Sequence, residues 1–380
     1  MKSRGPREAV IVGVGQTDFG ALYDNRDTFR DAYNLGAEAL RSALIDANLE
    51  KSELDGLLAA RIGYQRMADV AGLRYLRLVN NLPSAGRFSG VGVQYAMAMI
   101  ESGQVDTVAL VYGNNGRSVK QKYGGEGDGP TTAYDSMYGM TSPGAYVGMM
   151  YQRYRQMYGV PDDALAPLAI NNRRNAARNP VAVMKSEITV DEYMGSRYIA
   201  DPLRMLDYCI INDGAVCLIL TTMEKAEKLA KRPVRVAATA TMSDLWNFYT
   251  SRDFFYEGCR RVGESIYSAT GLGPEDMDCL QIYDNFTPTI LFSLEGFGHA
   301  KRGEAWEWIK GGRIHLEGDR PINTSGGHTG ESYMQGWAFH VEAVRQLRGE
   351  AGPQRQLKKC DTVQYMCASP IITSHVLVGA

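Results

Sequence analysis

The sequence lacks the features that mark nucleic-acid binders, membrane proteins and secreted proteins. Its 380 residues carry a formal net charge of −2, and no basic stripe stands out that would attract a phosphate backbone. No apolar run approaches the ~20 residues that a membrane-spanning helix needs. The first residues, MKSRGPREAVIVGVG, enter a strand pattern directly, without the apolar core and cleavage site of a signal peptide. We therefore predict a cytoplasmic protein with no nucleic-acid partner and no membrane span.

Paired metal-binding cysteines are also missing. None of the six cysteines belongs to a CxxC pair, which argues against a zinc site. Several lie in apolar, strand-like runs, where a buried and reduced thiol is the usual state. The six are Cys209, Cys217, Cys259, Cys279, Cys360 and Cys367. We expect no metal ion and no separate cofactor.

One glycine-rich loop lacks the reactive side chains that its position favours. The stretch SAGRFSGVGV, residues 84–93, precedes the helical run QYAMAMIESG as a catalytic loop would, yet it holds no cysteine, histidine or acid. Either the chemistry of this chain has been lost or its reactive groups lie elsewhere. Tyrosine, by contrast, is plentiful, with 22 residues.

What the chain does contain is an alternation of apolar strands and helices, which indicates an α/β fold. A Val-rich run at 8–20 predicts a buried strand and a glycine turn, and alanine-rich helical spacing over 31–49 predicts a helix. Short strands follow at 54–60 and 105–113, with an apolar helix at 92–103 between them. Later segments continue the pattern, with helices at 145–159, 162–179 and 223–231 and strands at 213–222 and 232–243.

The second half of the chain repeats the first. The stretch ANLEKSELDGLLAA matches TGLGPEDMDCLQIY, which places Asp55 opposite Asp278. The stretch VDTVALVYG matches CDTVQYMCA, and each follows a helix that ends in IESG or QLRG. We therefore predict two α/β halves, residues 1–231 and 232–380, with a loop insertion at about 114–205 in the first.

The duplication locates the site, because ligands of open α/β sheets bind beyond the carboxyl ends of the strands. Four loops qualify, namely SAGRFSG at 84–90, YDNFTPT at 283–289, INTSGGHTGESYMQG at 322–336 and MCASPI at 366–371. The Gly- and Tyr-rich part of the insertion, at 114–145, suits either a large apolar substrate or the docking of a partner chain.

Three stretches carry a resemblance to the thiolase superfamily, in its sterol-carrier-protein-type, lipid-transfer-protein-like branch. They are PLRMLDYCIINDGAVCLIL, YDNFTPTILFSLEGFG and INTSGGHTGESYMQGWAFHVEAVRQLRG. The resemblance runs from the first strand to the C-terminus. It implies the thiolase fold, in which two duplicated α/β halves form a five-layer α-β-α-β-α core, and it implies a homodimer.

Thiolases use four catalytic positions, and the resemblance indicates that most of them are changed here. The position of the nucleophilic cysteine falls within residues 86–88, which are Gly, Arg and Phe. Tyr283 stands where the N/H-x-x-F motif has Asn or His, and Tyr333 stands at the His of the GHPxG motif. The second cysteine is retained as Cys367.

The missing nucleophile argues against a ping-pong thiolase mechanism, because no acyl-enzyme can form at this loop. The two tyrosines carry phenolic protons and suit acid–base chemistry. The chain resembles the steroid side-chain aldolases, which lack the same nucleophile. This resemblance implies retro-aldol cleavage of a bulky β-hydroxyacyl-CoA, such as a steroid side-chain CoA thioester, with coenzyme A present only as part of the substrate. It also implies a heterotetramer with an OB-fold or zinc-ribbon-type partner.

A tyrosine that acts as a base needs electrostatic help. Its free pKa is about 10, so losing the proton at pH 7 costs roughly 4 kcal/mol. We therefore expect a cation or dipole beside one tyrosine, and His328 and Arg87 lie near the relevant loops in the sequence. His328 is accordingly a further candidate catalytic residue. Either tyrosine can be the acid or the base.

Four residues are candidates for substrate or oxyanion contacts. Ser89 and Gly90 lie at a helix N-terminus, where backbone N–H groups bind an oxyanion or a CoA phosphate. Gly327 and Asn285 lie in the two loops that carry the tyrosine positions. Either Asp284 or Asn285 is expected to cap the helix TPTILFSLEGFG.

Two other functions stay open. Cys367, used in place of the missing nucleophile, would make the chain an acyltransferase or a Claisen-type thiolase. A chain without catalysis at these positions would instead be a non-catalytic acyl-CoA-binding subunit. A covalent adduct from a labelled acyl-CoA distinguishes the first alternative from the retro-aldol hypothesis. Phenylalanine substitutions at Tyr283 and Tyr333 distinguish the second.

Overall fold

The computed structural model describes residues 7–25, 29–83, 87–121, 137–140, 142–229, 231–244 and 251–380. In this part of the chain, nine strands form one mixed sheet in the order β3-β2-β4-β7-β1-β8-β11-β10-β9. The strands are β1 Ala9–Gln16, β2 Gly56–Ala60, β3 Leu78–Leu82, β4 Thr107–Asn114, β7 Gly214–Thr222, β8 Val234–Ser243, β9 Cys279–Ile282, β10 Thr362–Cys367 and β11 Ile371–Gly379. A separate hairpin pairs β5 Tyr198–Ala200 with β6 Leu203–Arg204.

Helices precede or follow most strands, as the sequence pattern predicts. They are α1 Phe19–Asp24, α2 Ala32–Ala47, α3 Tyr64–Ala71, α4 Phe88–Glu101, α6 Pro143–Tyr158, α7 Ala166–Ala177, α8 Val190–Gly195, α9 Met223–Ala226, α10 Tyr256–Thr270, α11 Pro288–Gly296, α12 Ala305–Trp308, α13 Gly327–Gly330 and α14 Trp337–Arg348. No helix among the described residues is long and apolar enough to cross a bilayer.

The two halves of the sheet have the same strand order, which confirms the predicted duplication. Read from the outside inwards, β2, β4, β7 and β1 correspond to β9, β10, β11 and β8. In each half the first pair is parallel and the next two pairs are antiparallel. An isolated parallel bridge between Leu280 and Ile322 takes the place that β3 has in the first half. The halves join where β1 pairs with β8.

The residues that reveal the duplication make the same contact in both halves. The carboxylate of Asp55 accepts hydrogen bonds from the backbone N–H groups of Asp106 and Thr107, at 3.0 and 2.8 Å. Asp278 accepts from Asp361 and Thr362 at 2.8 and 3.1 Å. In each case an aspartate before one strand satisfies the unpaired donors at the start of its parallel neighbour.

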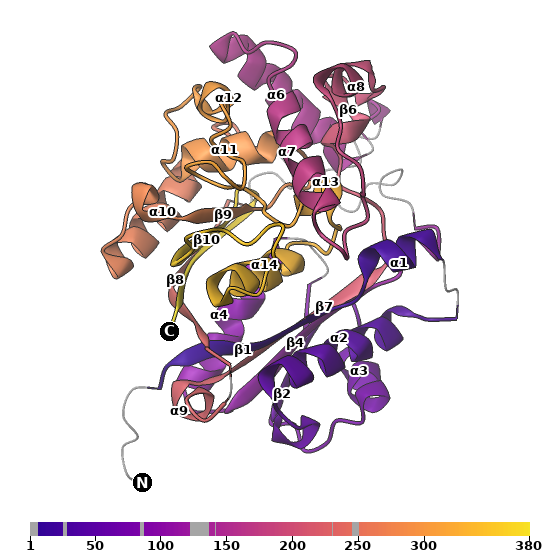
Figure 1. Ribbon diagram of the computed structural model, residues 1–380, viewed down its shortest axis with the longest axis vertical. Coiled ribbons are helices and arrows are strands. Elements are labelled where there is room, and N and C mark those ends of the chain that lie inside the picture. The colour runs from indigo at the N-terminus through magenta and orange to yellow at the C-terminus, as the bar shows by residue number, and fades with distance from the viewer. Residues whose placement is uncertain are drawn as a thin grey trace.

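The helices form the outer and central layers of the molecule (Figure 1). α2 and α3 pack on the sheet of the first half, and α10 and α11 pack on the sheet of the second. α4 and α14 lie between the two halves and contact strands of both. The five-layer core is therefore confirmed. α4 is apolar over most of its length because it is buried by strands on both sides.

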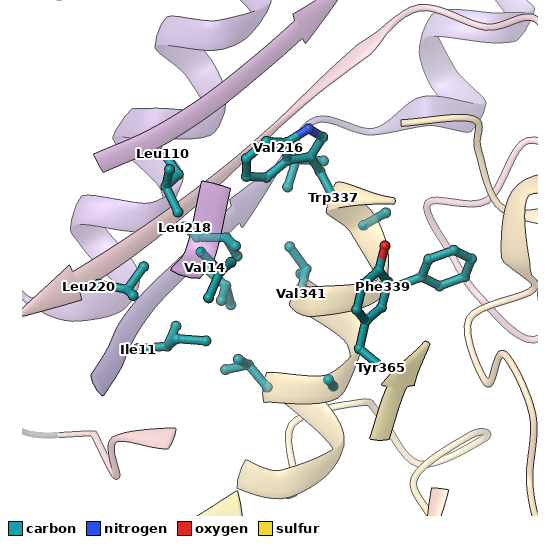
Figure 2. Packing of buried hydrophobic residues seen from close by; sticks show 14 of the residues in the cluster. Ile11, Val14, Leu110, Val216, Leu218, Leu220, Trp337, Phe339, Val341 and Tyr365 are labelled. Atoms are coloured by element: carbon teal, nitrogen blue, oxygen red, sulfur yellow. The ribbon is translucent and has the colours of Figure 1, made fainter. Parts of the chain in front are cut away.

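The central layer holds the halves together. Figure 2 shows side chains of β1, β4 and β7 facing Trp337 and Val341 of α14, with Phe339 and Tyr365 behind them. Trp337 is only 1% exposed and stacks on Tyr112, with ring centroids 6.4 Å apart. Gly92 of α4 also lies close to Trp337, since a Cβ at position 92 would be 2.8 Å from the edge of the indole ring.

Some predicted details differ from the structure. The helix expected at 223–231 ends at Ala226, and the chain continues in tighter turns in which the N–H groups of Lys228 and Leu229 donate to the carbonyls three residues before them. The elements α3 and β3 were not predicted. Within the insertion, residues 122–136 and 141 lie outside the described residues. The division at residues 231 and 232 stays a prediction.

We expect Trp337→Ala to lower the free energy of unfolding by about 3–5 kcal/mol, through lost apolar burial and the cavity left between the halves. Denaturant unfolding measures the change. Ile45→Ala is the control, because Ile45 is 71% exposed on α2 and its loss should change stability by less than about 0.5 kcal/mol. Equal losses in the two variants would contradict the role given to the central layer.

Candidate active site

Two tyrosine hydroxyl groups meet at one end of the second-half sheet. The hydroxyl oxygens of Tyr283 and Tyr333 lie 3.3 Å apart. Tyr283 directly follows β9, and its backbone N–H donates to the carbonyl of Met366 in β10 at 2.8 Å. Tyr333 lies between α13 and α14, and its backbone N–H donates to Oδ1 of Asn212 at 2.8 Å. Each tyrosine is thus held at its backbone N–H by a hydrogen bond to a neighbouring segment of the chain.

The two hydroxyl groups have different surroundings. Tyr283 is 4% exposed, whereas Tyr333 is half-buried. Burial raises the pKa of Tyr283 well above its usual value of 10, and the neighbouring Tyr333 raises it further. Tyr283 therefore keeps its proton at neutral pH and is a hydrogen-bond donor.

His328 lies between the tyrosines. Its ring meets those of Tyr283 and Tyr333 edge-on, with centroids 4.8 and 5.0 Å apart. Its Nε2 accepts a hydrogen bond from the backbone N–H of Gly336 at 2.9 Å, so a neutral ring carries its proton on Nδ1. Nδ1 lies 3.2 Å from Oδ1 of Asp284. The angle at Nδ1 does not make this proximity a hydrogen bond, so the bond from Gly336 orients the ring, which packs against both phenols.

Asp284 is the buried anchor of this arrangement. Its carboxylate accepts hydrogen bonds from the backbone N–H of His328 at 2.9 Å and from Nδ2 of Asn172 at 2.7 Å. The prediction that Asp284 or Asn285 caps the following helix is wrong. α11 begins at Pro288 and its N-terminus receives no side-chain cap, because the carboxylate of Asp284 turns back towards the histidine instead. Asn285 is half-buried, and its carbonyl accepts from Cys209 N–H at 3.1 Å.

Close packing against Asp284 requires a glycine at position 327. Its φ is +61°, which disfavours other residues, and a Cβ there would lie 2.4 Å from Oδ2 of Asp284. Only glycine lets the loop approach the carboxylate this closely. The predicted contact of Gly327 and Asn285 with substrate stays a prediction.

Cys367 ends β10 beside the tyrosine pair. Burial raises the pKa of its thiol to about 12, although Ser369, Arg87 and Tyr365 each act in the opposite direction. Its Sγ donates to Oγ of Ser369 at 3.4 Å. The thiol is thus protonated at neutral pH, and a thiolate is the form that attacks an acyl group. Arg87, at the start of α4, is close enough to place its positive charge on this side of the site.

Ser89 and Gly90 face the strands of the second half. Oγ of Ser89 lies 3.0 Å from the hydroxyl of Tyr365, and both side chains are buried. A Cβ on Gly90 would lie 2.6 Å from Oγ1 of Thr373 and 3.1 Å from Nε2 of His375. Both residues are therefore held in the first turn of α4 against β10 and β11. Their predicted oxyanion contact stays a prediction.

The structure therefore gathers Tyr283, Tyr333 and His328, with Cys367 next to them. Sequence reasoning missed Asn172, and it missed Asn212 as the partner of Tyr333. A signal for the first was present, because α7 carries asparagines at helical spacing, on a face that an amphipathic helix would bury. Among the described residues no three His, Cys, Asp or Glu side chains converge as metal ligands would.

Two family models match the chain in succession. The one described as "Thiolase, N-terminal domain" matches residues 9–224. The one described as "Thiolase C-terminal domain-like" matches residues 240–377. Together they cover both halves of the sheet.

Individual relatives match over nearly the whole length. A 17-hydroxy-3-oxo-4-pregnene-20-carboxyl-CoA lyase of Mycobacterium tuberculosis is 32% identical and covers 90% of this chain and 92% of its own length. A steroid side-chain-cleaving aldolase of Thermomonospora curvata is 30% identical over 99% of this chain and 98% of its own. A solved structure described as "Ltp2-ChsH2(DUF35) aldolase" has a TM-score of 0.88 at 29% identity and covers 98% of both chains.

The raised pKa of Cys367 predicts an unreactive thiol. With a pKa of about 12, roughly one thiol in ten thousand is ionised at pH 8, against roughly a quarter for a free cysteine. We expect iodoacetamide to leave Cys367 of the folded protein unmodified over minutes at pH 8, as followed by mass spectrometry. The urea-unfolded chain, in which all six cysteines react, is the control. Rapid stoichiometric labelling of Cys367 in the folded protein would contradict this.

Proposed function

This chain belongs to the thiolase superfamily, and on that premise we propose that it is a carbon–carbon lyase that cleaves a β-hydroxyacyl-CoA by a retro-aldol reaction. The observation that carries the proposal is the pair of hydrogen-bonded hydroxyls of Tyr283 and Tyr333 in a fold whose nucleophile position holds Gly, Arg and Phe. Such a site can move protons but cannot form an acyl-enzyme there. The names of the two relatives, a lyase and an aldolase, support the same reaction class.

The reaction needs one base and one acid. The base accepts the proton of the β-hydroxyl group, the Cα–Cβ bond breaks, and the β-carbon leaves as a ketone or aldehyde. The electron pair of the broken bond stays on the shorter acyl-CoA as an enolate, which is then protonated at Cα. Coenzyme A is part of the substrate, and no separate cofactor enters.

We assign the base to Tyr333 and the donor to Tyr283. The more buried Tyr283 keeps its proton, so it can donate to the oxygen of Tyr333 and stabilise the phenolate that a base requires. A charge-assisted hydrogen bond of this kind offsets part of the roughly 4 kcal/mol that deprotonation costs at pH 7. Tyr333 is the less buried of the two, which places it nearer to an entering substrate.

Arg87 is the cation that we assign to the developing enolate. It occupies the start of α4, where the superfamily has its nucleophile, and its charge acts on Cys367 at the edge of the site. A fixed positive charge in a buried site stabilises negative charge more strongly than it would in water.

The relatives also guide the proposals on substrate and partner. Both named enzymes act on steroid compounds, so we propose a bulky substrate such as a steroid side-chain CoA thioester. The name of the similar structure includes a DUF35 chain, which favours a partner of that kind for this protein. The homodimer, the heterotetramer with an OB-fold partner and the cytoplasmic location remain predictions.

The acyltransferase alternative has less support. It requires an ionised Cys367, whereas burial keeps that thiol protonated. The substitutions described next distinguish a lyase from the other alternative, a non-catalytic acyl-CoA-binding subunit.

Removing either hydroxyl should reduce turnover without unfolding the protein. We expect Tyr283→Phe and Tyr333→Phe to lower kcat by about 10²–10⁴-fold, the usual contribution of a general acid or base. Tyr267→Phe is the control, because its hydroxyl also donates a hydrogen bond, to the carbonyl of Phe297 at 3.1 Å, but in the outer layer. If all three variants keep wild-type turnover in complex with a partner, the chain is a binding subunit instead.

A screen of β-hydroxyacyl-CoA thioesters, with and without a co-purified DUF35 protein, tests the reaction itself. We expect release of a ketone or aldehyde together with a shorter acyl-CoA, in equal amounts, as measured by chromatography. Consumption of thioester that requires free CoA, or a covalent acyl adduct on Cys367, would point to thiolase or acyltransferase chemistry.

A further inference from the structure

Four buried asparagines, three on α7 and Asn179 just after it, contact the loop that carries His328 and leads to Tyr333. Each side chain is at most 2% exposed, and each donates from Nδ2 to this loop. The acceptors are Ile322 O for Asn171, Ile322 O and Asn323 O for Asn175, Ser325 O and Glu331 Oε1 for Asn179, and Thr329 Oγ1 for Asn172. This helix lies inside the predicted insertion, far in sequence from both tyrosines.

Asn172 differs from the other three because it joins two loops at once. One amide N–H donates to Oδ2 of Asp284 at 2.7 Å, and the other to Oγ1 of Thr329 at 2.8 Å. Asp284 directly follows Tyr283. Thr329 directly follows His328 and lies in the helical turn before Tyr333. One side-chain amide therefore ties together the loops that bring the two phenols into contact.

Packing alone does not account for an asparagine here. Oδ1 of Asn172 accepts no hydrogen bond from the described residues, as is also true of Asn171 and Asn175, and an unsatisfied buried oxygen costs about 1–3 kcal/mol that an apolar residue would avoid. What sets Asn172 apart is the charged acceptor, Asp284, of its amide. Asparagine is also a weaker helix former than alanine or leucine. Rotating the amide by 180° would point its oxygen at the carboxylate of Asp284, so the donor orientation is fixed by charge.

We propose that Asn172 is a positioning residue that sets the contact between Tyr283 and Tyr333 from outside both of their loops. It acts through Asp284, which accepts a hydrogen bond from the backbone N–H of His328 at 2.9 Å, and the ring of His328 packs edge-on against both phenols. The catalytic consequence rests on the proposed retro-aldol function. The effect of Asn172 on the distance between the two hydroxyls does not rest on that function.

The first test compares Asn172→Ala with Asn171→Ala. Both residues are buried on α7, but Asn171 donates only to the carbonyl of Ile322, at the far end of the loop from Tyr333, whereas Asn172 donates to Asp284 and Thr329. We expect Asn172→Ala to lower kcat by about 10–100-fold with KM within about threefold, because small displacements of reacting groups are costly. Asn171→Ala should keep kcat within about threefold while losing a similar amount of stability. Equal kcat values in the two variants would overturn the proposal.

A second variant gives a readout that a purely structural role would not move. In Asn172→Asp two carboxyl groups face each other at hydrogen-bond distance and share one proton, which restores a link to Asp284. That proton is lost as pH rises, so the kcat of Asn172→Asp relative to wild type should fall with rising pH. The same ratio for Asn172→Ala should stay flat. A flat ratio for both variants would count against the link between Asn172 and Asp284.

Crystal structures of the alanine variants separate this inference from the proposed function. We expect the distance between the Tyr283 and Tyr333 hydroxyls to lengthen beyond hydrogen-bonding range in Asn172→Ala and to stay near 3.3 Å in Asn171→Ala. Failure of the wild-type protein to cleave any thioester would remove the proposed function and leave this comparison intact. An unchanged distance in both variants would remove the inference and leave the proposed function intact.

Discussion

The contact between the hydroxyls of Tyr283 and Tyr333 is the interaction on which the proposed chemistry of this protein depends. Two phenols 3.3 Å apart, one of them almost fully buried, form a site in which a proton can be held on one oxygen and withdrawn from the other. In water neither would be a useful base at neutral pH. The two phenols differ in burial, and Tyr283, the more buried of the two, is the costlier one to ionise.

The duplication of the fold could be predicted from the sequence because it rests on local, repeated requirements. Asp55 and Asp278 stand at equivalent offsets since each half has the same pair of unpaired N–H groups to satisfy at the start of a parallel strand. The central layer was expected only from the resemblance to the thiolase superfamily, although a helix as apolar as α4 must be covered on most sides. The short β3, whose three exposed middle residues include two asparagines, carries no such pattern and was missed.

The site could be predicted only in part. The positions of Tyr283 and Tyr333 followed from the resemblance to a known family, and His328 followed from its place near them in the sequence. The structure brings all three together. The role of Asp284 could not be found in this way. An aspartate near the start of a helix is usually expected to cap that helix. Here the carboxylate of Asp284 instead accepts a hydrogen bond from the backbone N–H of His328, 44 residues away in the sequence. Contacts of this range leave no periodic trace in a single sequence.

The same reasoning explains why the insertion belongs to the site rather than to its periphery. α13 has only four residues, Gly327–Gly330, and a single helical turn is too short to hold its own shape. Its conformation must come from its surroundings. Those surroundings are α7, which approaches so closely that a Cβ on Gly326 or Gly330 would lie 2.6 or 2.7 Å from Ala176 or Asn172. The glycines permit this approach, and the asparagines donate to the buried carbonyl groups of the loop before Tyr333, so its shape depends on α7.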